Sequence, residues 1–403
     1  MKLVHALIVT IMMSLNAVAS QQCQDLFKQK PHEMFKQLLE SKSPSQLLRS
    51  NAEQYWAWAK LNAENYFKNS VDILTYEGRV VGDPHNKNFG LIPYMKKLIW
   101  TVVDADDAGT APFILDFARY VAAIKAVSDV KTKVLWNSYV AGLSGQEIVA
   151  PPIVEKYLNL TFEQYRELEV KKANKFTDGT GLKLLNNGVE SSVIQNDNRR
   201  HQIKAVFEKA FSQSNWQVLD VGGREKDRGG SKEALRFVAL VREDDGRITI
   251  FELKEDLGTS VDQFKQQVQD NLLRTLDDYI YSRSESHLGG YDPSYQVVRF
   301  KFDGNEREFL LRRKQLYFFD AANSVDTKKE EDEFYQLSIY NAWFMGRLHS
   351  GQKASRTYVS AIRHDQNGII VEGVKQLVKS YLDLLVFELK DAKKRKGKMS
   401  SEG

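Results

Sequence analysis

The chain has 403 residues, of which 42% are hydrophobic and 27% are charged, so its composition is that of an ordinary globular protein long enough for two hydrophobic cores. Its formal net charge of +4 is small, and its basic residues are spread through segments equally rich in acidic ones, which does not indicate a nucleic-acid-binding protein. The single cysteine, Cys23, excludes an internal disulfide framework and a cysteine-rich zinc site.

The first segment, residues 1–19, is typical of a secretory signal peptide. Lys2 precedes an apolar run over residues 3–15, and Ala17 and Ala19 are the small residues expected before a cleavage site. We therefore expect cleavage after Ala19 and export of a soluble protein to the periplasm or the medium. The alternative is a short hydrophobic N-terminal helix. No later stretch of the sequence is long and apolar enough to cross a membrane.

The N-terminal half is predicted to be mainly helical. Apolar residues recur at helical spacing over residues 28–74, 116–127 and 154–175. The apolar run at 98–103 predicts a strand. Residues 174–200 are rich in Gly, Asn, Asp and Ser, which is typical of a linker.

The C-terminal half begins with a predicted β-rich part. Its pattern indicates three strands, at 217–221, 235–241 and 247–253, and then one helix at 261–282. Two further strands follow at 296–302 and 308–313. This is the order of elements in the small lobe of a protein kinase. Helical spacing returns at 332–349 and 371–394, before a basic tail at 393–396.

Two acidic segments carry the residue types that phosphoryl transfer needs. Residues 82–88 read GDPHNKN, and Asp104 ends the strand predicted after them. The reaction uses one carboxylate to orient and deprotonate the acceptor hydroxyl, with amide and carboxylate oxygens to hold magnesium on the phosphates. In this interpretation Asp83 is the base, Asn88 and Asp104 are magnesium ligands, and Asp106 contacts a second ion. Either segment alone would be interpreted as an ordinary turn. Their order and spacing together favour the interpretation that they form a phosphoryl-transfer site.

The predicted β-rich part supplies candidates for binding the nucleotide. Lys254 ends the third predicted strand, at a position where an apolar residue is expected from the polar-apolar alternation. Kinases carry their phosphate-anchoring lysine on the third strand of the small lobe. Gly229, Gly230 and Ser231 lie between the first two strands, where backbone amides can cover phosphate oxygens. The alternatives are a solvated strand end for Lys254 and a plain hairpin turn for the glycines.

Two further residues are expected to be structural neighbours of the site. Dinuclear metallophosphoesterases also contain Gly-Asp-X-His, but they need several more histidines on loops, which this sequence does not offer in the right settings. His85 is therefore read as structural. Asp116, at the start of the helix after the acidic turn, is expected to be a buried carboxylate that braces the loop, and His349 at a helix end is also read as structural.

Several motifs resemble one known family. Residues 82–90 (GDPHNKNFG), 104–107 (DADD) and 112–119 (PFILDFAR) resemble the bacterial domain-of-unknown-function 2252 family. That family shares its Gly-Asp-X-His-X-X-Asn and Asp-X-Asp motifs with aminoglycoside phosphotransferases and choline-kinase-like proteins. The similarity continues more loosely around Lys254 and over residues 346–351 (GRLHSG), and so covers most of the chain between about residues 51 and 351.

The resemblance and the order of predicted elements imply the same architecture. We expect an α+β, protein-kinase-like two-lobed fold, permuted so that the catalytic-loop part precedes the five-stranded small lobe. Residues 20–200 would form a helical lobe with the catalytic and metal-binding loops, and 201–320 the small lobe with the glycine loop and the anchoring lysine. Residues 321–403 would complete the helical lobe. Asp262 or Asp270 would be the ion partner of the lysine.

The expected function is an ATP- and magnesium-dependent phosphotransferase acting on an unknown hydroxyl-bearing small molecule or protein. ATP is scarce outside the bacterial cytoplasm, so export requires either delivery into a cell that supplies ATP or loss of catalysis. Two alternatives therefore stay open, namely a non-catalytic kinase-like ligand-binding protein and a nucleotidyl transferase on the same fold. The sequence does not identify the acceptor or the oligomeric state.

Overall fold

The computed structural model describes residues 43–94, 97–104, 107–177, 197–223, 234–258, 260–261, 296–314, 328–352, 355–365 and 367–399. The predicted signal peptide, the glycine segment at 229–231 and the predicted helix at 261–282, apart from Val261, lie outside them. Helices and antiparallel sheets occur together, which confirms the prediction of a mixed helix-and-sheet protein. In the part of the chain that is described, no helix has the length and apolar character needed to cross a membrane.

The β-rich part is a five-stranded antiparallel sheet with the order β5-β6-β7-β9-β8. Its strands are β5 (Gln217–Gly223), β6 (Arg236–Arg242), β7 (Ile248–Glu255), β8 (Gln296–Phe302) and β9 (Asn305–Arg313). All five strands were predicted, with ends within a few residues of those observed. The turns between β6 and β7 and between β8 and β9 use Gly246 and Gly304, with φ angles of 81° and 82° that favour glycine.

The two faces of this sheet have different neighbours. Helix α9 (Asp197–Ala210) covers one face, where Phe207 packs in a cluster with Phe251 and Leu253 of β7. The opposite face packs against the end of helix α8 (Phe162–Ala173) and the following turn. Because side chains alternate along a strand, Glu252 and Lys254 lie on this second face. Helix α9 starts inside the predicted linker, so the β-rich part begins slightly before residue 201.

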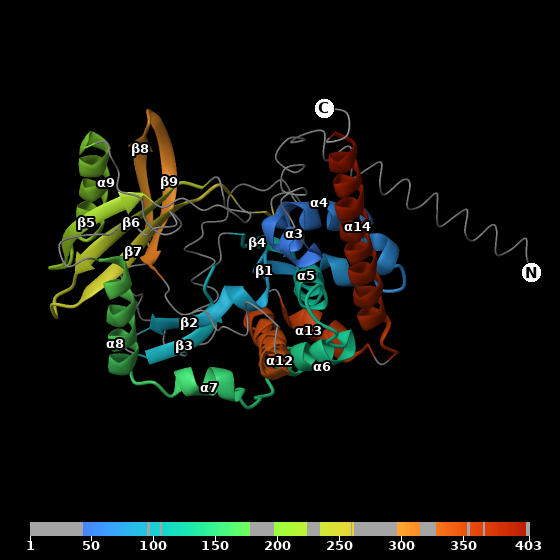
Figure 1. Cartoon of the computed structure of the whole chain (residues 1–403). Coiled ribbons are helices and arrows are strands. Elements are labelled where there is room, and N and C mark those ends of the chain that lie inside the picture. The colour runs from blue at the N-terminus through green and yellow to red at the C-terminus, as the bar shows by residue number, and fades with distance from the viewer. Residues whose placement is uncertain are drawn as a thin grey trace, which may run out of the picture.

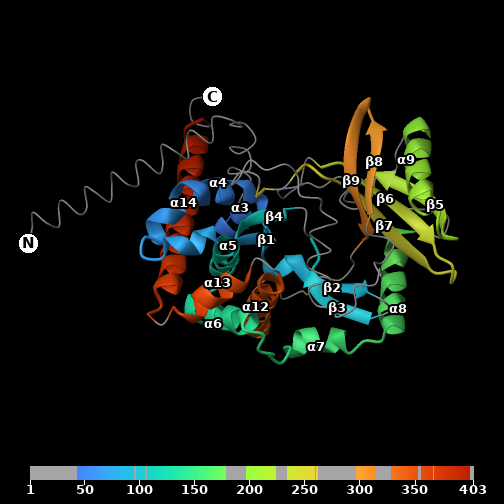
Figure 2. The same cartoon turned by 180° about the vertical axis from the view of Figure 1, so that it is seen from behind.

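The remaining helices form a second part of the molecule (Figure 1). They are α3 (Pro44–Ser50), α4 (Ala52–Tyr66), α5 (Phe113–Lys125), α6 (Thr132–Leu143), α12 (Lys328–Ser350), α13 (Ser355–Arg363) and α14 (Ile369–Met399). Helix α7 (Pro152–Leu158) and then α8 lead from these helices to the sheet, and Figures 1 and 2 show the same separation from opposite sides. The chain therefore builds helices, then the sheet, and then returns to the helices.

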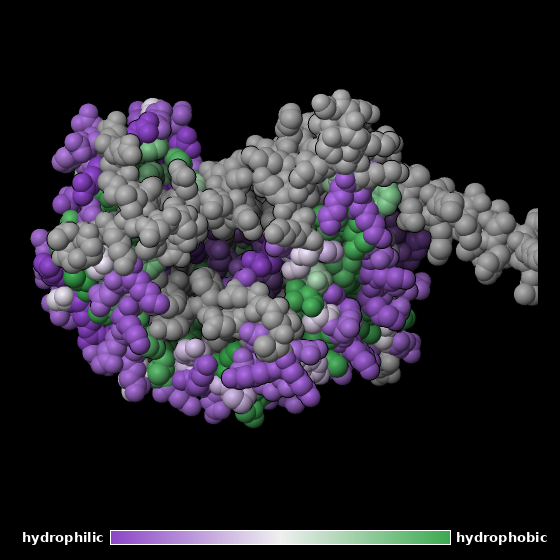
Figure 3. Space-filling view, in the orientation of Figure 1, coloured by the Kyte–Doolittle hydropathy of each residue, from purple (hydrophilic) through white to green (hydrophobic). Residues whose placement is uncertain are grey.

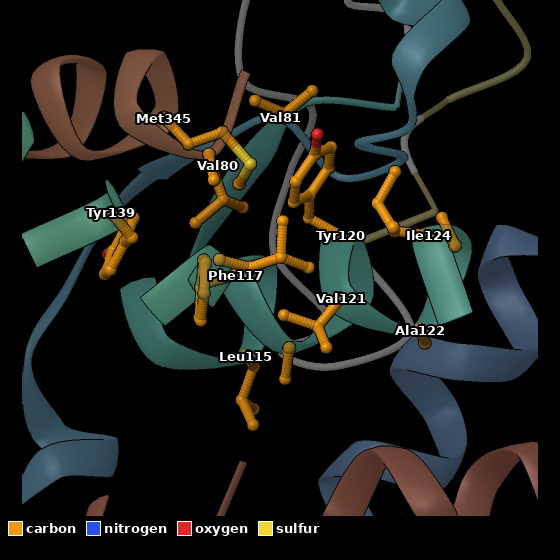
Figure 4. Close-up of a cluster of buried hydrophobic side chains, with 14 of the residues drawn as sticks. Val80, Val81, Leu115, Phe117, Tyr120, Val121, Ala122, Ile124, Tyr139 and Met345 are labelled. Carbon is orange, nitrogen blue, oxygen red and sulfur yellow. The ribbon is translucent and has the colours of Figure 1, made fainter. Parts of the chain in front are cut away.

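Helix α5 is the centre of the helical part. Every residue from Phe113 to Ile124 is buried, as expected for a helix that is surrounded by other elements. Figure 4 shows Phe117 and Tyr120 of α5 beside Val80 of the short strand β1 (Glu77–Val80) and Met345 of α12. Strand β1 pairs with β4 (Gly109–Pro112), which leads directly into α5. This packing fixes the loop after β1 against the helix.

Helices α6 and α12 are in direct backbone contact through two glycines. A Cβ atom on Gly142 would lie 2.0 Å from the carbonyl oxygen of Trp343, and one on Gly346 would lie 2.1 Å from that of Tyr139. Any side chain at either position would push the helices apart. Since α12 also carries residues that reach the candidate site, this contact sets their position.

The substitution Gly346→Ala tests this contact. Alanine normally stabilises a helix relative to glycine by about 1 kcal/mol, but here the clash should lower the free energy of unfolding by about 2 kcal/mol or more. Urea denaturation measures the change. Ser360→Ala on the exposed face of α13 is the control and should have little effect. A Gly346→Ala variant as stable as the wild type would contradict the close helix contact.

Candidate functional site

The GDPHNKN loop, residues 82–88, begins with a glycine that no other residue can replace without strain. Gly82 has a φ angle of 81°, and a Cβ atom there would lie 1.7 Å from the carbonyl oxygen of Asp107. The backbone of this loop therefore touches the segment that follows Asp104. The indole nitrogen of Trp56 donates a 2.7 Å hydrogen bond to the Gly82 carbonyl oxygen.

Asp116 holds the start of the loop in place. Its carboxylate is fully buried and accepts 3.0 Å hydrogen bonds from the backbone N–H groups of Val81 and Gly82. His349 Nε2 lies 3.1 Å from the same carboxylate, and its Nδ1 lies 2.7 Å from the hydroxyl of Tyr139. Helices α5, α6 and α12 thus converge on the turn before Asp83, and Asp116 and His349 both have a structural role.

The middle of the loop is attached to α12 by polar side chains. The Asn86 amide nitrogen donates to the Ser338 hydroxyl at 2.9 Å, and its oxygen accepts from Asn341 at 3.0 Å. The Tyr120 hydroxyl lies 2.8 Å from the same Asn86 oxygen. Asn341 in turn accepts a 3.0 Å bond from the Trp100 indole nitrogen. Because all these groups are buried, breaking one contact leaves polar atoms without partners.

Asp83 lies between Arg119 and His85. Asp83 is only 6% exposed. Its Oδ1 atom lies 2.5 Å from Arg119 Nη2. Oδ2 lies 3.5 Å from His85 Nε2. Burial on its own raises the pKa of Asp83, but the positive charge of Arg119 and the contact with His85 hold that pKa below its usual value. Burial also lowers the pKa of His85.

A hairpin links the chain at Asn88 to the segment that carries Asp104. Strand β2 (Phe89–Tyr94) pairs with β3 (Lys97–Val102) in a register that places Phe89 opposite Val102. The pairing continues one step further, because the Val103 N–H donates a 2.8 Å bond to the Asn88 carbonyl oxygen. The side-chain Nδ2 of Asn88 donates a 2.8 Å hydrogen bond to the backbone carbonyl oxygen of Asp83. The Oδ1 atom of Asn88 therefore points away from that contact. Local strand pairing thus places the backbone of Asn88 opposite Val103, the residue before Asp104.

Lys254 of the five-stranded sheet meets Asp104 of the helical part. The two residues are 150 positions apart in sequence, and Lys254 Nζ lies 3.1 Å from Asp104 Oδ1. Lys254 is only 2% exposed, so it is not a solvated strand end. Arg312 of β9 reaches the same carboxylate oxygen at 3.1 Å and also donates to the Val103 carbonyl oxygen at 3.2 Å. Two cations of the sheet therefore converge on one carboxylate.

Glu252 holds Arg312, one of the two cations beside Asp104, together with a further arginine of the sheet. Arg312 Nη2 lies 3.2 Å from Glu252 Oε2, and Arg236 Nη1 lies 3.6 Å from Glu252 Oε1. Glu252 and Lys254 project from the same face of β7. In Figure 3 hydrophilic atoms are visible in a recess between the two parts of the molecule.

Several predicted site residues lie outside the described part of the chain. They are Asp106, Gly229, Gly230, Ser231, Asp262 and Asp270. Among the described residues, no group of three or more His, Cys, Asp or Glu side chains is arranged to hold a metal ion. The described magnesium candidates are the Asn88 amide and the Asp104 carboxylate, both oxygen donors of the kind that Mg²⁺ prefers.

Two arginines at the site were not predicted from the sequence. Arg119 lies three residues after Asp116 in a helix that is otherwise almost entirely apolar. Charged residues are rarely buried without a partner, so an arginine in such a helix signals a buried ion pair. Arg312 lies in β9 opposite Glu252 of β7, which becomes visible only once the strand register is known.

Comparison with family models, with curated proteins and with solved structures found no match for this chain. The resemblance to the domain-of-unknown-function 2252 family therefore rests on the motifs quoted above.

The brace at Asp116 can be tested by stability measurements. Asp116→Ala removes the acceptor of two buried backbone N–H groups and the partner of His349, so we expect the free energy of unfolding to fall by about 3 kcal/mol. Asp129→Ala, at an exposed aspartate shortly after α5, is the matched control and should change it by less than about 0.5 kcal/mol. Chemical denaturation measures both, and equal effects would contradict the brace.

Proposed function

We propose that this chain is a kinase-like phosphotransferase that uses ATP and magnesium to phosphorylate a hydroxyl group. The observation that carries this proposal is the 3.1 Å contact between Lys254 Nζ and Asp104 Oδ1. A lysine from a β-sheet and a carboxylate that follows a strand end are the two groups expected to meet at the phosphates of a bound nucleotide. Their meeting across the two parts of the molecule supports a shared site.

The arrangement of elements also supports a permuted kinase-like fold. A five-stranded antiparallel sheet follows the loop that carries Asp83 and Asn88, and α12 to α14 return to pack with the first helices. In a two-lobed enzyme the site lies between the lobes, so the order of the lobes in sequence does not change which groups can meet there. We propose this fold on the basis of that arrangement.

Each residue of the site has a proposed role. Asp83 orients and accepts the proton of the acceptor hydroxyl, while Asn88 and Asp104, with Asp106 on a second ion, would hold magnesium. Lys254 and Arg312 would bind the nucleotide phosphates, with Gly229 to Ser231 covering them. The carboxylate and amide oxygens of Asn88 and Asp104 suit Mg²⁺, which when bound would neutralise charge on the phosphates.

The proposed reaction is a direct transfer. The acceptor oxygen forms a bond to the γ-phosphorus of ATP as the bond from that phosphorus to the β–γ bridging oxygen breaks, and the hydroxyl proton passes to Asp83. The lowered pKa of Asp83 is compatible with this role, because a loose transition state needs little proton removal before bond breaking. Asp83 then acts mainly by orienting the hydroxyl, and Arg119 keeps the carboxylate in place.

One observation favours the second candidate, a ligand-binding protein without catalysis. Asp83 is 6% exposed and one of its oxygens is already held by Arg119, which restricts access of an acceptor. A protein exported to a compartment without ATP, as residues 1–19 predict, would also have no use for turnover. Nucleotidyl transfer is the third candidate, and it would release pyrophosphate in place of ADP.

The test is ATP consumption by the full chain with magnesium and a pool of hydroxyl-bearing acceptors such as polyols, sugars and hydroxyamino acids. We expect magnesium-dependent ADP formation that Asp83→Asn lowers by at least about 100-fold, while ATP binding is retained. Asp129→Asn is the control for a change of surface charge and should behave like the wild type.

The products separate the three candidates. Unchanged turnover in Asp83→Asn would remove this residue from the mechanism. ATP binding without any consumption would favour the ligand-binding protein, and release of pyrophosphate would favour nucleotidyl transfer.

A further inference from the structure

The sequence contains one strongly charged segment that the proposed site does not use. Residues 390–398 (KDAKKRKGK) include six basic residues and one acidic residue, a net charge of +5, whereas the formal net charge of the whole chain is +4. The rest of the chain is therefore close to neutral, and the positive charge of the protein is concentrated in this segment. A basic segment of this length attracts an anionic surface.

The basic segment is the last part of helix α14, and one side of this helix is buried. Leu385, Leu389 and Ala392 are at most 5% exposed and belong to the core of the helical part. They follow one another at spacings of four and three residues, so they lie along one side of the helix. Figures 1 and 2 both place α14 at the edge of the molecule away from the five-stranded sheet. The side opposite these three residues therefore faces away from the core.

Apolar and basic side chains occur together on that outer side. Phe387 is 58% exposed and Val386 is 37% exposed. Lys390 and Lys393 are exposed as well. Lys390 lies three residues after Phe387, and position 394 lies four residues further on, so helical spacing puts these positions on one face. The outer face of α14 is therefore both apolar and cationic.

The acidic residues of the same stretch do not lie on the outer face. Glu388 is 8% exposed, and its Oε2 atom accepts a 2.8 Å hydrogen bond from Gln54 Nε2 of α4. Asp391 is partly buried. Between Val386 and Lys393 the exposed residues are therefore two apolar residues and two lysines, with no exposed carboxylate.

This combination suits a lipid bilayer better than another macromolecule. A bilayer of anionic lipids offers negative headgroups for the lysines and, beneath them, an apolar layer for an exposed phenylalanine. A second copy of this chain would bring the same positive charge against the segment, which is repulsive. A nucleic acid duplex offers negative charge to the lysines but no apolar layer to Phe387 and Val386.

We propose that the end of α14 binds to the surface of an anionic lipid membrane. The basic segment lies at the headgroups and Phe387 inserts just below them, so the helix rests on the membrane and does not span it. This inference is independent of the proposed phosphotransfer, because none of its residues belongs to the site between the sheet and the helical part.

Sedimentation of the full chain with lipid vesicles tests the proposal. Vesicles of phosphatidylglycerol mixed with phosphatidylcholine supply an anionic surface, and vesicles of phosphatidylcholine alone are neutral. We expect binding to the anionic vesicles at low ionic strength and its loss as salt is added, because salt screens the headgroup charge. Lys390→Gln and Lys393→Gln should each weaken this binding by about fivefold, and Phe387→Ala by about tenfold.

Two matched controls keep the same chemical change but move it to the other part of the molecule. Lys171→Gln removes an exposed lysine of α8, which Figures 1 and 2 place far from α14. Leu257→Ala truncates an apolar side chain that is 58% exposed, the same fraction as Phe387. Both variants should bind the anionic vesicles like the wild type.

Four results would overturn the proposal. One is the absence of binding to anionic vesicles, and another is anionic binding that the α14 variants do not weaken. Equal binding to neutral vesicles, unchanged in Phe387→Ala, would assign membrane binding to the apolar run at residues 3–15. Binding of a DNA duplex that Lys390→Gln weakens, in a protein that does not bind vesicles, would make nucleic acid the partner of this segment.

Discussion

The ion pair between Lys254 and Asp104 joins the two parts of this molecule at the candidate nucleotide site. Lys254 reaches the pair because alternation along β7 turns it away from α9 and toward the helical part. Asp104 directly follows the β2–β3 pairing, in which Asn88 lies opposite Val103. The contact therefore combines one local feature, a hairpin, with one long-range feature, the packing of the sheet beside that hairpin.

Buried charge is arranged differently on the two sides of the site. Around Asp104 the cations Lys254 and Arg312 share its carboxylate, and Arg312 also pairs with Glu252, so the cluster joins charges from β7, β9 and the segment after β3. Around Asp83 the direct partners are Arg119, 2.5 Å from one carboxylate oxygen, and His85, 3.5 Å from the other. The second side of the site is therefore built around one buried Arg–Asp pair within the helical part.

The sequence predicted those features that depend on local patterns. The five strands follow from alternation and from Asp-Gly turns. Lys254 was singled out because an apolar residue was expected at that strand end, but the register shows that it continues the alternation on the face of Glu252. Helix α6 and strand β2 were not predicted, since β2 (FGLIPY) contains Gly and Pro and lacks a polar-apolar alternation. Arg119 and Arg312 could not be assigned to the site, because only the packing of α5 against the loop and the register of β9 bring them to Asp83 and Asp104.

The most direct measurement is calorimetric titration of ATP into the full chain, with and without magnesium. The wild type should bind ATP more tightly when magnesium is present. Lys254→Met should weaken ATP binding by about tenfold or more through loss of a charge-assisted contact, and Asp104→Asn should remove the effect of magnesium. ATP binding that is equal in wild type and Lys254→Met, or absent from wild type, would contradict the claim that the two parts of the chain form one nucleotide site.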